Sequence, residues 1–217
     1  VWIAWLNGSM YHEVHGREDG RHRSLIFLQM MLLVVLAVYA GHATAEDGRA
    51  FALTYALLLA VLAWQWWSVR RHDTEPSYRA ITTRYVAGLG MAIILTLASI
   101  VVDPRVRVVI WAVLVLAWVA ATAALELNTR NQPLGASPTE SMAERFGLFT
   151  IIVLGEVVVG VVDGLVEVDR NPQTMATGLL ALTIGFGFWW NYFDAVGRRV
   201  PRSSRGSFTT WIVAHLP

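Results

Sequence analysis

The chain has 217 residues, of which 55% are hydrophobic and only 15% are charged, and its formal net charge at pH 7 is +1. Ordinary soluble domains contain about 25% charged residues, so a chain this apolar is better suited to a lipid bilayer than to water. The small net charge excludes a nucleic-acid-binding protein that works by bulk charge. Because the chain has no cysteine and no lysine, its own residues cannot form disulfides, thiol nucleophiles or Schiff bases.

Six apolar stretches are long enough to cross a membrane as helices, which takes about 20 residues. In chain order they cover residues 25–41, 51–69, 85–102, 108–127, 146–166 and 174–193, and shorter apolar stretches cover 1–10 and 207–216. These stretches lack the alternation of β-barrel strands, which favours helices. We therefore predict an all-α, polytopic transmembrane helix bundle with six complete spans and a partial span at each end. It would form a single transmembrane domain over residues 1–217, as a fragment of a longer protein.

The arginines predict which loops face the cytoplasm. Thirteen of the seventeen basic residues, all of them arginine, lie in residues 11–24, 70–84, 128–145 and 194–206. The other four, Arg49, Arg105, Arg107 and Arg170, lie in the alternate loops. Because cytoplasmic loops of membrane proteins carry an excess of basic residues, we expect the first set of loops to be cytoplasmic.

Turn and capping residues predict where several helices begin. Asp103 and the proline after it end one span and begin the next across a very short turn, which requires two antiparallel helices. Ser137 is placed as an N-cap, with Pro138 in the first helical turn and Glu140 completing a capping box. Asn171, again followed by proline, is expected to cap the next helix.

The helix expected from about residue 138 to 166 carries ionisable groups within its apolar run. Helical geometry places Arg145, Glu156 and Asp163 on one face of this helix. A charge at the bilayer centre costs about 2.5–3.5 kcal/mol, so Glu156 should not face lipid. We expect it to meet a partner from another helix, to line a water-filled cavity or to be protonated. A buried polar site at Glu156 is therefore the main functional candidate.

A second acidic residue is expected at the same depth as Arg145. The turn between the two helices is centred near Asp169. Arg145 lies 24 residues before Asp169, and Asp194 lies 25 residues after it. An antiparallel pair of helices would bring Arg145 and Asp194 together as an ion pair, with Asn191 one turn away. The predicted polar or ion site comprises Glu144, Arg145, Glu156, Asn191 and Asp194. Alternatively, Arg145 and Asp194 are separate interfacial charges that reach the lipid headgroups.

Glycines mark positions where helices are expected to approach closely. Gly160 and Gly164 have the small-xxx-small spacing that lets the backbones of two membrane helices come together. Gly185 and Gly187 are interpreted in the same way.

Three histidines, His12, His15 and His22, lie near the first cytoplasmic loop. They could bind a metal, but their spacing is not that of a zinc protease and the loop is rich in charge, so a solvated loop is the preferred interpretation. No nucleophile with its base and no nucleotide fingerprint is found in the chain. We therefore expect no enzyme activity, no cofactor and no metal site.

The run from Ala143 to Glu156, AERFGLFTIIVLGE, closely resembles the signature of the bacterial low temperature requirement A membrane protein family. Other pieces are similar to the same family and follow its order: Trp5 with Asn7, LQM at 28–30, WWNYFD at 189–194 and HLP at 215–217. Ser141 stands where many members carry a histidine. The resemblance implies a multi-pass protein of the bacterial plasma (inner) membrane that is linked to growth in the cold. It implies no established activity, cofactor or substrate.

Two functions are consistent with these observations. The first is a transporter or channel that handles a proton or small ion at Glu156, because an ionisable residue within a membrane span is a functional candidate by default. The second is a membrane scaffold or sensor that supports envelope function in the cold, in which the polar groups hold helices together. The expected partners are the lipid bilayer and a proton or small ion, with no nucleic acid.

Overall fold

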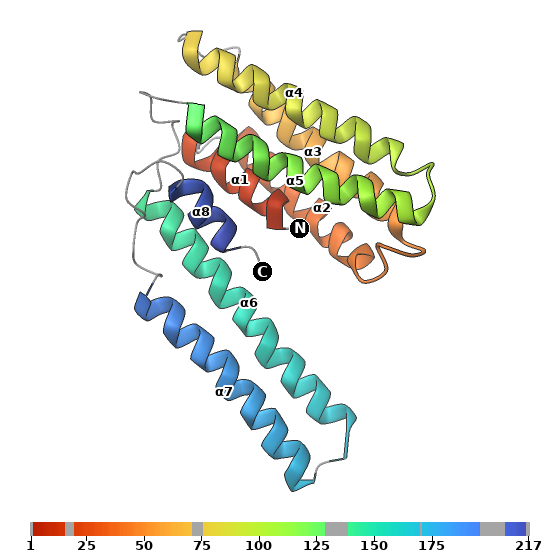
Figure 1. Ribbon diagram of the computed structural model, residues 1–217, viewed down its shortest axis with the longest axis vertical. Coiled ribbons are helices and arrows are strands. Elements are labelled where there is room, and N and C mark those ends of the chain that lie inside the picture. The colour runs from red at the N-terminus through yellow and green to blue at the C-terminus, as the bar shows by residue number, and fades with distance from the viewer. Residues whose placement is uncertain are drawn as a thin grey trace. The chain divides into compact units, whose positions relative to one another are not determined.

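The computed structural model describes residues 2–15, 20–70, 76–128, 139–169, 171–195 and 207–215, which form α-helices and no strand (Figure 1). The helices are α1 (Trp2–His15), α2 (Gly20–Ala40), α3 (Gly48–Arg70), α4 (Pro76–Ala98), α5 (Pro104–Asn128), α6 (Glu140–Glu167), α7 (Pro172–Ala195) and α8 (Ser207–Ala214). Each apolar stretch expected from the sequence overlaps one of these helices, although the stretch 85–102 runs beyond the end of α4 at Ala98. The prediction of an all-α fold is therefore confirmed.

Four of the described helices are long and apolar enough to cross a membrane, judged by length and composition. They are α2, α3 from Gly48 to Val69, α5 from Pro104 to Ala124, and α6. A shorter apolar helix covers Thr82–Ala98 within α4. These helices support a multi-pass membrane protein, while the exact number of six complete spans stays a prediction.

The chain forms two compact units, residues 1–135 with α1 to α5 and residues 136–217 with α6 to α8, and each is described by itself. In the first unit, α3 packs against α1, α2 and α4. Small buried residues of α3, Ala52 and Ala56, allow this close packing. Leu58 packs with Leu36 of α2, whereas Leu59 packs in a cluster with Leu89 of α4. Buried side chains on different sides of α3 thus make it the central helix of this unit.

The turn between α4 and α5 is built around a buried arginine. Asp103 accepts a hydrogen bond from the backbone N–H of Arg105 at 2.9 Å, which confirms the predicted short turn. Arg107 is only 3% exposed, and its Nε donates to the carbonyl of Ser99 at 2.9 Å. The guanidinium is favourable here because the unpaired carbonyls at the end of α4 carry partial negative charge. An ideal Cβ at Gly48 would lie 2.6 Å from the backbone carbonyl oxygen of Ala43 and would also crowd the guanidinium of Arg107. Because the backbone cannot move aside as a side chain end can, glycine is required at this position.

In the second unit, α6 and α7 run side by side in antiparallel directions (Figure 1). Asn171 caps α7 as predicted, because its Oδ1 accepts from the backbone N–H of Thr174 at 2.9 Å. The predicted cap of α6 was wrong. Thr139 is the N-cap and accepts from the backbone N–H of Met142 at 3.0 Å, so α6 begins at Glu140, and Ser137 and Pro138 lie outside the described residues.

Close contact between α6 and α7 depends on different glycines from those expected. A Cβ at Gly178 would lie 2.7 Å from Leu165 Cδ1, and one at Gly185 would lie 3.3 Å from Val157 Cγ1. Within the part of the chain that the structure describes, no atom lies within 4 Å of such a Cβ at Gly160, Gly164 or Gly187. The expectation is therefore confirmed for Gly185, whereas Gly160, Gly164 and Gly187 lie outside the contact between α6 and α7, and a close approach of another helix there stays a prediction.

Candidate functional site

Polar side chains are buried between the helices of the first unit. Asn7 of α1 is 1% exposed, and its Oδ1 accepts a hydrogen bond from the hydroxyl of Tyr85 in α4. Gln29 of α2 donates through its Nε2 to Oε1 of Gln65 in α3 at 3.0 Å. The two bonds therefore join α1 to α4 and α2 to α3. Neither pair carries a formal charge, so both can be buried at moderate cost.

One donor of the Gln29–Gln65 pair has no hydrogen-bond partner in the described part of the protein. Gln65 is 0% exposed, and its Nε2 is buried without a partner among the described residues. A buried donor left unsatisfied costs about 1–3 kcal/mol, and such a group in a native fold calls for an explanation. A water molecule or a small polar species beside Gln65 would satisfy it.

Two histidines lie next to this network at the arginine-rich end of the unit. His12 Nδ1 and His22 Nε2 are 3.0 Å apart, and His22 is 7% exposed. The ring of Tyr11 stacks on His22 with centroids 5.5 Å apart and lies edge-on to Trp66 at the same distance. The expectation of a solvated loop was therefore wrong for His22, because Tyr11 and His12 of α1 pack against its ring and it is buried. The side chain of His15 lies outside the described residues.

We call this set of buried and half-buried hydrogen-bonding residues the polar core. It comprises Asn7, His12, His22, Gln29, Gln65 and Tyr85. In α2, His22 and Gln29 are two turns apart and share one face of the helix. The polar core supplies amide, phenol and imidazole groups, which can bind a polar molecule or pass a proton between neighbours. Among the described residues, no group of three or more histidines and acidic residues is placed to hold a metal.

The residues predicted as the ion site lie on α6 and α7 of the second unit. Glu144 and Glu156 are exposed and Arg145 is half-buried. Asp194 is exposed in the last turn of α7, at the same end of the antiparallel pair as the first turns of α6 (Figure 1). Asn191 is exposed too. The Arg145–Asp194 ion pair stays a prediction, as does a partner for Glu156, which neither α7 nor α8 covers.

Three of the segments that resemble the family contact one another in the second unit through Phe146, Tyr192 and His215. Phe146 is 0% exposed and contacts the rings of Trp211 and His215, with centroids 4.4 Å and 4.7 Å away. His215 Nδ1 lies 2.7 Å from the carbonyl of Trp211, so this nitrogen must be the donor. In the neutral ring, Nε2 then accepts from the hydroxyl of Tyr192 at 3.1 Å. This cluster attaches α8 to α6 and α7.

Sequence reasoning missed the polar core, although a signal was present. Gln65 stands alone between tryptophans within an apolar run, and Gln29 stands alone among leucine and methionine residues. An isolated amide within a membrane span needs a partner for the same reason that an isolated carboxylate does. Applying that argument to amides as well as to Glu156 would have identified both glutamines.

Comparisons with known proteins agree with the resemblance. The family model described as bacterial low temperature requirement A protein (LtrA) matches residues 1–217. A protein of Rhizobium meliloti (strain 1021), named only as uncharacterised, is 26% identical over 205 residues, which cover 89% of this chain and 48% of that protein. The chain thus spans about half the length of this relative. No solved structure matches it. Since the family model covers the whole chain, the protein belongs to the bacterial low temperature requirement A family.

Proposed function

We propose that this membrane protein is a transporter or channel that moves a proton or small ion through polar groups inside its helix bundle. The observation that supports this best is the fully buried Gln65, whose Nε2 lacks a partner within the polar core. In our proposal, water or a passing ion completes the hydrogen bonding at this position. We propose neither an enzyme activity nor a cofactor.

The arrangement of the polar core fits a path that begins at the arginine-rich ends of the helices. His12 and His22 lie there, at the last turns of α1 and the first turns of α2. Gln29 lies two turns further along α2, about 10 Å deeper along the helix axis. We place this end at the cytoplasmic surface of the bacterial inner membrane, in accordance with the arginine distribution.

We assign Glu156 the role of a group that takes up and releases a proton or binds the ion. Its depth within α6 makes an unpartnered charge costly, and intramembrane carboxylates often belong to ion or proton paths. Arg145, Asn191 and Asp194 would gate access to Glu156 from the end of the α6–α7 pair where α6 begins and α7 ends.

The test is flux into liposomes that contain the purified protein, measured with a pH-sensitive dye and with cation-sensitive dyes. We expect flux from the unmodified protein and a flux rate about tenfold lower in Gln65→Leu and in Glu156→Gln. A tenfold lower rate corresponds to an activation free energy that is higher by about 1.4 kcal/mol. Glu140→Gln is the matched control, because Glu140 is exposed in the first turn of α6. An unmodified protein that moves no proton, ion or solute would overturn the proposal.

A scaffold or sensor that supports the envelope in the cold is the alternative, and the geometry of the amides is consistent with it. The Asn7–Tyr85 and Gln29–Gln65 bonds each join two helices, as expected of polar groups that only hold a bundle together. In that case Gln65→Leu would lower the yield of folded protein, and neither the variant nor the unmodified protein would show flux. Measuring folded yield and flux on the same samples therefore separates the two functions.

A further inference from the structure

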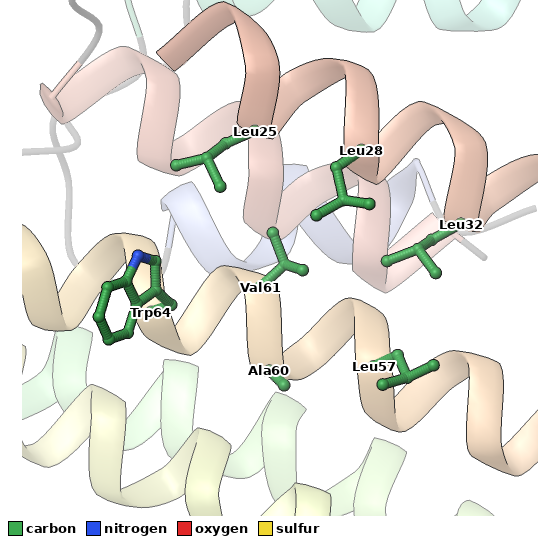
Figure 2. Close-up of a pocket in the computed structure, with 7 residues that line it drawn as sticks. All are labelled: Leu25, Leu28, Leu32, Leu57, Ala60, Val61 and Trp64. Carbon is green, nitrogen blue, oxygen red and sulfur yellow. The ribbon is translucent and has the colours of Figure 1, made fainter. Parts of the chain in front are cut away.

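An apolar groove of about 440 Å³ lies between α2 and α3 on the surface of the first unit. Its lining consists of Leu25, Leu28, Leu32, Leu57, Ala60, Val61 and Trp64 (Figure 2). Figure 2 shows the leucines of α2 directed toward α3, with Trp64 opposite Leu25 at one end of the groove. Because α2 and α3 are helices of spanning length, this surface lies at the depth of the acyl chains.

A basic residue stands at the Trp64 end of the groove. Arg21 lies one turn before Leu25 in α2, and helical geometry places it within about 40° of Leu25, Leu28 and Leu32 around the helix axis. Its side chain is exposed. Arg23, which is also exposed, lies about 200° away from Arg21 and so on the opposite face. Arg21 is thus on the same face of α2 as the groove, and Arg23 is not.

We propose that the groove binds one acyl chain of an anionic phospholipid, whose phosphate is held by Arg21. The lining supplies only aliphatic side chains and one indole, which suits a hydrocarbon chain and offers no polar contact along its length. A guanidinium pairs well with a phosphate, and this positive charge at the groove's end selects an anionic headgroup over a zwitterionic one. Trp64 is 55% exposed at that end, and indoles favour the level of the headgroups.

The proposal is tested by native mass spectrometry of the purified protein with phosphatidylglycerol or phosphatidylcholine of identical acyl chains. We expect the unmodified protein to retain phosphatidylglycerol about fivefold better, the factor that one arginine near an anionic headgroup supplies. Arg21→Gln should remove this preference, whereas Arg23→Gln, the matched control, should keep it. Ala60→Phe should fill the groove and reduce retention of both lipids, whereas Ala87→Phe, on the exposed surface of α4, should not.

Several results would overturn the proposal. Equal retention of the two lipids would show that no anionic headgroup is selected. Equal loss in Arg21→Gln and Arg23→Gln would show that the preference depends on general surface charge. Unchanged retention in Ala60→Phe would place the lipid outside the groove, and conversion of a dimer to a monomer by this variant would show that a second copy occupies it. Helix content from circular dichroism verifies that each variant is folded.

Discussion

The Gln29–Gln65 pair allows a test of whether these two side chains of the polar core are coupled by their hydrogen bond or are only neighbours. Replacing Gln29 with leucine leaves both the Oε1 and the Nε2 of the fully buried Gln65 without a partner in the described part of the protein. Replacing Gln65 with leucine instead removes a donor that is already unsatisfied. Gln29 is only half-buried, so the loss of its partner leaves less of its amide enclosed by the protein than the loss of Gln29 leaves of Gln65. The two substitutions should therefore have unequal effects.

The magnitudes follow from the cost of unpaired polar groups. Gln29→Leu should lower the free energy of unfolding by about 1–3 kcal/mol, because it leaves a buried amide unsatisfied. Gln65→Leu should lower it by about 0.6 kcal/mol, a typical value for a hydrogen bond between membrane helices. The double variant replaces the pair with two apolar side chains of similar size, so it should be more stable than Gln29→Leu alone.

The free energies are measured by reversible unfolding in mixed detergent and SDS micelles, followed by circular dichroism. Gln173→Leu controls for the change from glutamine to leucine, because Gln173 is exposed on α7. A double variant whose loss equals or exceeds the two single losses added together would refute the reasoning, because uncoupled sites behave in that way.

Two further predictions concern packing, and both are measured by thermal unfolding in detergent. Gly48→Ala should destabilise the fold by about 1–3 kcal/mol, because its Cβ would lie 2.6 Å from the backbone carbonyl oxygen of Ala43 and would displace the guanidinium of Arg107. Gly88→Ala, with open space around it, should be neutral or stabilising by up to about 1 kcal/mol. Equal effects of the two substitutions would contradict the close packing of Gly48 against Ala43 and Arg107. Phe146→Ala should cost about 3–5 kcal/mol, because the ring is fully buried. Leu148→Ala, at a position 54% exposed, should cost much less, and similar losses would argue against the Phe146 cluster.

The positions of the helices could be predicted from the sequence because they depend on local information. Apolar runs of about 20 residues must form helices in a bilayer, since every backbone polar group needs a partner there. Short signals also set the turns correctly: Asp103 with its proline, and Asn171 before α7. Before α6, two hydroxyl residues stand close together. The same reasoning chose Ser137 as the N-cap of α6, whereas Thr139 is the N-cap in the structure.

Which helix faces meet was decided only by the tertiary structure. Gln29 and Gln65 are 36 residues apart, and Asn7 and Tyr85 are 78 apart, so no local pattern connects them. In a soluble protein the apolar face of a helix marks the core, but in a membrane the lipid-facing side is equally apolar, and periodicity loses this information. The same physical reason explains why sequence reasoning chose Gly160, whereas the structure has Gly178 at the contact between α6 and α7.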